Sequence, residues 1–324
     1  MKELVKRREV TLLGIMLVVV VVVTLRNSAF LTLRNFEDIL KDSSILLIVS
    51  IGQLLVILTG GIDLSVASTI GFSGMSVALL NHLVPGIPLV VILLIAMGIG
   101  LVLGSFNGTL VSVFGIPPII TTLGTLSIYR GFIIILSGGK WVSADQMTAA
   151  FREFPQDRLL GLSNMISLAI LVSLIFAGIL YLTRTGREIH GVGGNRLAAQ
   201  YVGINIRRID FLVFALSGVL AGLAGYLLVA FYASAANDSA SGLELQTVAA
   251  CVIGGVSILG GSGTIVGVIL GSVFLGIVKN ALTVIRISPF WQVAIQGIVI
   301  LFAIVLSTVF DRRAQAGILR RRVL

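Results

Sequence analysis

Residues 64–129 form a run of 66 residues that contains no Asp, Glu, Lys or Arg. A helix needs about 20 apolar residues to cross the hydrocarbon core of a membrane, so this run is long enough for three spans. Prolines interrupt it at residues 82–88 and 114–118, where a continuous helix is disfavoured. We therefore predict an all-α polytopic membrane protein. A transmembrane β-barrel is excluded, because its strands alternate polar and apolar residues, whereas runs such as 17–23 are continuously apolar.

The composition excludes the other broad classes of protein. Hydrophobic residues make up 57% of the chain and charged residues 11%, against about 25% charged residues in soluble domains. So apolar a chain also has the opposite of the disordered signature, and the single cysteine, Cys251, cannot build a disulfide scaffold. We expect one transmembrane domain over residues 1–324, with no room for a soluble catalytic domain.

The charge-free runs predict about ten transmembrane helices when all of them are counted by length. The first run follows a basic start, so a cleavable signal peptide is the alternative there. The absence of a small-residue cleavage pattern after Val23 favours an uncleaved helix. The expected spans lie in residues 10–25, 43–62, 64–129 (three), 159–183, 211–237, 245–278 (two, divided at residues 260–263) and 287–310.

The positive charges predict the orientation of these spans. Fourteen of the 23 Lys and Arg residues lie in residues 2–8, 184–208 and 312–322, and such clusters mark cytoplasmic loops. Ten spans then place both termini in the cytoplasm and the charge-balanced residues 139–158 outside. The net charge of +9 thus follows from membrane topology, and we expect lipid rather than nucleic acid as a partner.

Two segments of the chain resemble each other weakly. Residues 62–76 align with residues 243–257, sharing an acid, a Leu, a Gly and a Ser, and the region after Asn107 resembles that after Asn280. Partners five spans apart have opposite orientations, which predicts an inverted repeat of two five-helix halves with the substrate path between them. Coincidence in so biased a composition is the alternative.

Enzyme chemistry has no residues to support it. The two histidines, His82 and His190, fall on opposite faces of the predicted membrane topology, and no G-x-x-x-x-G-K-[ST] motif occurs. We therefore expect no catalytic residues, no metal site and no cofactor bound by this chain.

Polar residues inside predicted spans are the better functional candidates, because they are costly in lipid and tend to face a bundle interior or a water-filled path. Asp63 follows Gly60 and Gly61 and either breaks a helix at the path or caps the next helix. The remaining residues either present hydroxyl, carboxyl and amide groups to a neutral polyol or join helices by hydrogen bonds. The candidate path residues are Asp63, Ser65, Asn107, Thr121, Thr122, Glu244, Gln246, Gln292 and Gln296.

The inner stretch 184–208 predicts a short capped helix. Asn195 is a plausible N-cap for a helix through Val202 that Gly203 closes. A short helix between two spans is shaped to dock into another protein, whereas a solvated basic loop is the alternative.

Several separate motifs lie along the chain: Gly60 to Ser65, Thr122 to Leu126 with Tyr129-Arg130-Gly131, Gly193-Gly194-Asn195 with Ala198-Ala199 and Gly203-Ile204, and Ala249-Ala250 with Gly254-Gly255 and Gly260 to Gly263. Together they resemble the permease subunits of bacterial ABC importers for ribose, other monosaccharides and the furanosyl signal autoinducer-2. The resemblance covers nearly the whole chain, and Ala67, where the family usually has Gly, is a mild departure.

The resemblance implies a transport subunit of the bacterial inner membrane that works with other proteins. Its partners would be a second permease, forming a homodimer or heterodimer, a cytoplasmic ATPase that binds ATP-Mg, and a periplasmic sugar-binding protein. Residues 139–158 would form a periplasmic loop and residues 184–208 a cytoplasmic coupling loop. The ATPase-coupling residues would be Gly186, Arg187, Gly193, Asn195, Ala198, Ala199 and Gly203.

The substrate is less well defined. Gly138 to Val142 resembles a motif of autoinducer-2 and rhamnose permeases, from which many ribose permeases differ. An ion-coupled secondary sugar carrier is the rival interpretation, with Asp63 and Glu244 as its coupling sites.

Overall fold

The computed structural model describes residues 2–159, 161–288, 290–298, 301 and 305. Almost all of the regular structure is helical, and the one sheet is a hairpin of two short strands. The elements are α1 (Lys2–Arg26), η1 (Ser28–Leu31), α2 (Leu33–Leu58), α3 (Val66–Leu83), α4 (Leu89–Ser112), α5 (Pro118–Ser137), η2 (Ala144–Gln146), α6 (Ala149–Glu153), β1 (Arg158–Leu159), β2 (Leu162–Ser163), α7 (Asn164–Leu182), α8 (Arg184–Gly194), α9 (Arg196–Tyr201), α10 (Ile206–Tyr232), α11 (Leu243–Ile253) and α12 (Ile265–Val284).

Local sequence sets the ends of these helices. Thr32, Ser163 and Thr264 each accept a hydrogen bond from a backbone N–H in the first turn of α2, α7 and α12, which satisfies donors that a helix start leaves free. Pro118 opens α5, and Gly138, at φ +60°, ends it. The predicted proline interruptions are therefore confirmed as helix boundaries.

Eight described helices are long and apolar enough to cross a membrane: α1, α2, α3, α4, α5, α7, α10 and α12. The molecule is thus a multi-pass membrane protein. The expected span that begins at residue 245 is different, because α11 has only 11 residues and reaches about 16 Å at 1.5 Å per residue. Much of the expected span 287–310 lies outside the described residues. The total of ten spans, the cytoplasmic termini and the inverted repeat stay predictions.

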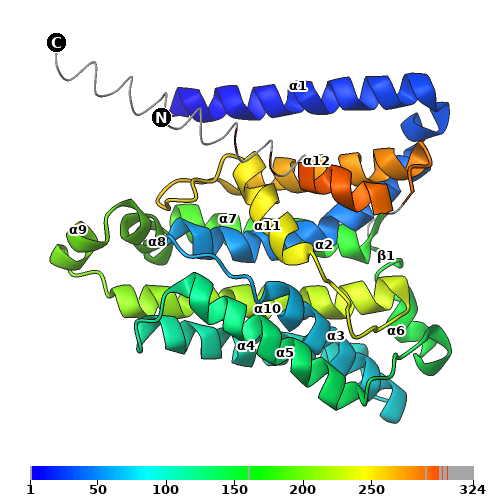
Figure 1. Ribbon diagram of the computed structural model, residues 1–324, viewed down its shortest axis with the longest axis horizontal. Helices are drawn as coiled ribbons and strands as arrows, with labels where there is room; N and C mark the ends of the chain where they lie inside the picture. The colour runs from blue at the N-terminus through cyan, green and yellow to red at the C-terminus, as the bar shows by residue number, and fades with distance from the viewer. Residues whose placement is uncertain (1, 160, 289, 299–300, 302–304, 306–324) are drawn as a thin grey trace.

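The long helices stack in layers (Figure 1). α1 lies at one edge against α12, α2 and α7 follow, α10 comes next, and α3, α4 and α5 form the opposite edge. From Ser43 to Leu58, α2 carries no charged residue and every residue is buried, which is typical of a helix at the centre of a bundle.

Glycines allow α4 and α10 to approach closely. A Cβ atom built on Gly100 would strike the carbonyl oxygen of Gly218, and one on Gly222 would strike that of Ala96. Small residues at membrane helix contacts permit this approach of one backbone to another. The two helices therefore meet backbone to backbone.

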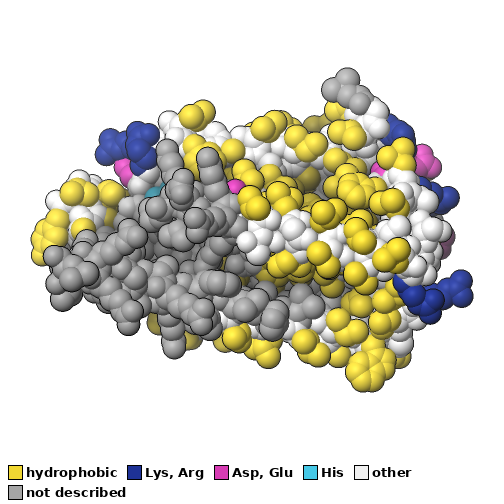
Figure 2. Space-filling model, turned by 90° about the horizontal axis from the view of Figure 1, so that it is seen from above, with side chains coloured by type: hydrophobic (Ala, Val, Ile, Leu, Met, Phe, Trp, Pro, Cys, Tyr) yellow, Lys and Arg dark blue, Asp and Glu magenta, His cyan; other side chains and the backbone are white. Residues whose placement is uncertain are grey.

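The two ends of the bundle carry different structures. α8 and α9 form one end, together with the start of α1, and α6 and β1 lie at the other (Figure 1). Figure 2 shows hydrophobic side chains over the middle of one face, with Lys and Arg side chains towards the ends. The end with α8 and α9 contains the stretch predicted to be cytoplasmic.

Candidate translocation and coupling sites

A buried polar network surrounds Asp63, in the extended segment between α2 and α3. Asp63 is buried, with only 3% of the residue exposed. Its Oδ1 accepts hydrogen bonds from the Ser65 N–H at 3.0 Å and the Ser65 hydroxyl at 2.6 Å, and Oδ2 accepts one from Ser217 of α10 at 3.4 Å. The carboxylate therefore holds the helix break against α10.

The network continues into α4 and α5. The Asn107 amide donates to the Ser65 hydroxyl at 2.8 Å, and the Tyr129 hydroxyl lies 3.3 Å from the Asn107 amide oxygen. Thr122 donates to the backbone carbonyls of Ile62 and of Pro118 in its own helix. Four predicted path residues, Asp63, Ser65, Asn107 and Thr122, thus meet at one place.

The other predicted path residues lie elsewhere. The Glu244 carboxylate accepts from the Gly242 N–H at 3.0 Å and so stabilises the start of α11. Gln292 donates to the carbonyl of Ile287 at 2.8 Å. The Thr121 hydroxyl is buried and has no hydrogen-bond partner among the described residues.

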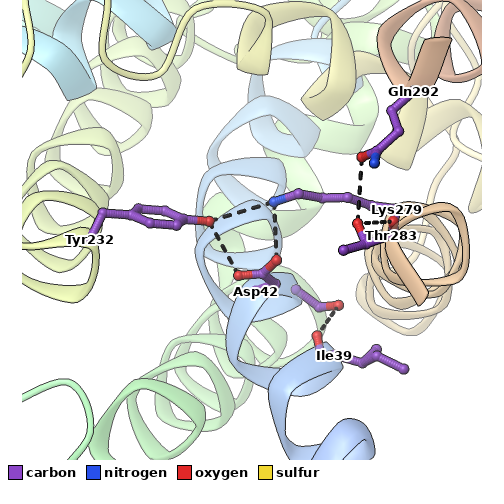
Figure 3. Close-up of polar contacts among 7 residues, drawn as sticks. Ile39, Asp42, Tyr232, Lys279, Thr283 and Gln292 are labelled. Atoms are coloured by element: carbon purple, nitrogen blue, oxygen red, sulfur yellow. Dashed lines mark hydrogen bonds and ion pairs between the residues drawn. The ribbon is translucent and has the colours of Figure 1, made fainter. Parts of the chain in front are cut away.

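Gln246 and Gln296 share a hollow at the opposite end of the bundle from α8 and α9. Asp42 of α2, Tyr232 of α10 and Lys279 of α12 line the same hollow. Figure 3 shows these three side chains converging. The Lys279 ammonium lies 3.0 Å from Asp42 Oδ2, and the Tyr232 hydroxyl lies 3.3 Å from Asp42 Oδ1.

The predicted short helix is confirmed as α9. Asn195 caps it by accepting a hydrogen bond from the Ala198 N–H at 3.0 Å, and Gly203, at φ +82°, follows its end. Ala199 packs inward, whereas Ala198 is exposed. Three large apolar side chains of this segment also face outward: Leu197 is 69% exposed, Tyr201 90% and Val202 77%.

The preceding residues form a second helix, α8, rather than a loop. Gly186 lies in its first turn, where the Thr183 hydroxyl accepts from its N–H at 3.2 Å, and a Cβ here would strike the carbonyl of Leu180. Arg187 is exposed. The amphipathic sequence of α8, with Ile189 and Val192 buried, explains why it packs on the bundle.

A junction of backbones joins α8 to the end of α2 and to the loop after α11. A Cβ on Gly193 would strike the carbonyl oxygen of Leu58, and the Gly261 N–H donates to that same oxygen at 2.9 Å. Arg196 reinforces the junction by donating to the Thr59 carbonyl at 3.1 Å and pairing with Asp210 of α10. α8 is therefore in direct backbone contact with the end of α2, from which the chain continues into the segment that contains Asp63.

Sequence reasoning missed several residues of these sites. Tyr129 and Ser217 complete the Asp63 network, and Asp42 and Lys279 form an ion pair across the hollow. Lys279 carried a signal, since it is the charge that ends the otherwise uncharged run 245–278. Tyr129 belonged to a motif of the resembling family but was given no role, and Ser217 carried no signal, because a single hydroxyl in an apolar helix is common.

The comparisons with known proteins agree with this architecture. The family described as branched-chain amino acid transport system / permease component matches residues 35–304. A protein of Enterobacter sp. (strain 638) named autoinducer 2 import system permease protein LsrC is 37% identical over 308 residues, which cover 95% of this chain and 88% of the relative. No solved structure matches this chain.

Further relatives carry the same name. The protein of Klebsiella pneumoniae is 36% identical over 95% of this chain and 88% of the relative. That of Yersinia pseudotuberculosis is 35% identical over 99% of this chain and 89% of the relative. With the family match extending over most of its length, this chain belongs to the family of permease components described as the branched-chain amino acid transport system type.

Proposed function

We propose that this chain is the membrane-spanning subunit of an ATP-driven importer that carries autoinducer-2, or a monosaccharide of similar size such as rhamnose or ribose, into the bacterial cytoplasm. The substrate proposal rests on the relatives, which are named as autoinducer 2 import permeases and cover nearly the whole chain. Ribose and rhamnose are the alternatives within the resembling family.

The arrangement of α8 and α9 carries the proposal. α9 exposes Leu197 and Tyr201, and Val202, directly after it, is exposed as well. An apolar surface of this kind at the end of a membrane bundle is suited to a protein partner. α8 contacts the end of α2 by backbone at Gly193. A partner that moves α9 would therefore move the helix break at Asp63 without any bond chemistry in this chain.

The same arrangement supports a set of partners. A cytoplasmic ATPase that binds ATP-Mg would receive the coupling segment 184–208, and a second permease, identical or related, would complete the pathway. A periplasmic sugar-binding protein would deliver the substrate to the outer end, where residues 139–158 form part of the surface. The Val142 N–H donates to the Ala235 carbonyl at 3.1 Å, which joins this loop to the one after α10 and supports a fixed docking platform.

The decisive experiment reconstitutes the chain in liposomes with its candidate ATPase and a panel of autoinducer-2, rhamnose and ribose binding proteins. We expect one binding protein to stimulate ATP hydrolysis and uptake of its sugar. Ala198→Glu and Gly203→Glu should abolish the stimulation, because they add charge to α9 and its end. Uptake driven by an ion gradient without any ATPase would instead establish a secondary carrier.

A further inference from the structure

The hollow between α2, α10, α11 and α12 combines polar groups of both kinds with apolar walls. Asp42 supplies a carboxylate, Lys279 an ammonium group and Tyr232 a phenol, and these are the groups drawn together in Figure 3. One leucine from each of the four helices completes the walls: Leu46, Leu228, Leu243 and Leu275. Binding sites for small molecules have this composition, mostly apolar with a few convergent polar groups.

Two amides in the hollow are available to a ligand. The side chains of Gln246 on α11 and Gln296 both line it, and neither makes a hydrogen bond to another of the residues that the structure describes. An amide offers one acceptor and two donors. A ligand with several hydroxyl groups would satisfy both amides.

The lining charges select against charged ligands. Asp42 and Lys279 are paired at 3.0 Å and their charges cancel. The carboxylate would repel an anionic ligand, and the ammonium group would repel a cationic one. A hydrocarbon would leave the polar groups without partners, which costs free energy. A neutral polyhydroxylated ring, with hydroxyls for the polar groups and C–H bonds for the leucines, fits both kinds of surface.

The hollow also lies where an imported substrate would enter. Tyr232 is the last residue of α10, Lys279 lies five residues before the end of α12, and Asp42 lies in the first half of α2. These ends face away from α8 and α9 (Figure 1). A charged pair on membrane helices, with the Lys279 side chain 45% exposed, is placed towards water or protein rather than lipid.

We propose that this hollow is an entry subsite for a neutral polyol, in which Gln246 and Gln296 hydrogen-bond the sugar hydroxyls beside the Asp42–Lys279 pair. The assignment deepens the proposed function and rests on it for the direction of transport. A purely structural ion pair that holds α2 to α12 is the alternative that the experiments must separate.

The first experiment tests binding with the full chain alone in lipid nanodiscs, so it needs no ATPase. The native cysteine, Cys251, is fully buried and gives little background. Leu243 lines the wall of the hollow and is not one of its polar groups, so Leu243→Cys can be labelled with a small water-soluble thiol reagent while both amides stay in place. We expect labelling, slowed about threefold or more by millimolar autoinducer-2 or ribose and unaffected by equimolar sodium chloride. A labelling rate unchanged by every sugar in the panel overturns the subsite, even if transport proceeds.

The second experiment measures uptake by the reconstituted importer as a function of loaded binding protein. Gln246→Leu should raise the concentration for half-maximal uptake about fivefold, the loss expected for one hydrogen bond. Exchanging the charges, with Asp42→Lys and Lys279→Asp in one chain, keeps an ion pair but moves the donor and acceptor. We expect uptake by the exchanged chain to stay below that of the wild type. Uptake equal to the wild type would show that the ion pair is only structural.

Glu37 provides the matched control. It pairs with Lys41 and Arg158 at the same end of the molecule but does not line the hollow. Glu37→Gln should leave both sugar protection and half-maximal uptake unchanged. If the Leu243→Cys chain shows sugar protection but the wild-type chain shows no ATP-driven uptake, the subsite stands and the proposed function fails, so the two claims are decided separately.

Discussion

Gly193→Ala is the substitution that most directly tests the junction between α8 and α2. The new Cβ would lie between the Leu58 carbonyl oxygen and the Gly261 N–H, which are hydrogen-bonded to each other at 2.9 Å. It would lie 2.5 Å from the Gly261 nitrogen, where ordinary contact begins at 3.4 Å. The Leu58 carbonyl oxygen would lie closer still, so backbone movement must supply at least about 0.9 Å, because no side chain is there to turn aside.

The magnitude follows from that movement. Forcing an extra methyl group into a filled contact costs about 1–3 kcal/mol, and losing the Gly261 hydrogen bond adds about 1 kcal/mol. If this strain destabilises the conformation in which α8 contacts the end of α2, the fraction of molecules in that conformation falls about fivefold or more. Binding-protein-stimulated ATP hydrolysis should fall by that factor, while basal hydrolysis, which needs no junction, stays near wild type.

Gly194→Ala is the matched control, one residue further along the same helix. A Cβ at Gly194 has nothing within 4 Å, and alanine favours a helix over glycine by about 1 kcal/mol. The assay compares both variants in liposomes with the ATPase, together with thermal unfolding of the purified chains. Equal stability and equal stimulation of the two variants would refute the reasoning that this contact transmits movement.

Three further predictions concern other parts of the chain. Gly100→Ala should lower the free energy of unfolding by about 1–3 kcal/mol, since its Cβ would strike the Gly218 carbonyl. Gly98→Ala should not, because a Cβ there has nothing within 4 Å. Denaturation of both variants in detergent measures the difference. Asp63→Asn keeps an acceptor for its hydrogen bonds and should retain uptake in proteoliposomes, whereas collapse of uptake would favour an ion-coupled carrier. Asn195→Ala removes the α9 cap and should cost about 1 kcal/mol of local stability, seen as faster amide exchange in α9 than in α8.

The fold could be predicted from the sequence where one local property determines the structure. The length of the uncharged runs predicted the eight long helices, because apolar segments enter lipid and charged segments stay in water whatever the tertiary contacts are. The N-cap at Asn195 was equally local, since the side chain bonds a backbone group three residues away. α11 was not predicted to be short, because its residues are as apolar as those of a spanning helix, and only the fold shows where it ends.

The candidate sites were harder to predict, because they join residues distant in the sequence. Asp63, Ser65 and Asn107 were identified as polar groups in apolar runs, but hydrogen bonds to α4 and α10 decide their partners. Gln246 and Gln296 were identified by the same rule, and their meeting beside Lys279 required the arrangement of helices. Patterns of residues thus found several members of each site and none of the connections.

The backbone contact between α4 and α10 has a consequence for how opening and closing could be observed. Where Gly100 and Gly218 meet, no side chain lies between the two helices that could change rotamer and allow one to slide past the other. Gly104 extends this contact along α4. We therefore expect α4 and α10 to keep their separation as other helices move. Paired spin labels, one on the α4–α10 pair and one on α8 or α11, would then report the motion of the second helix against a fixed frame.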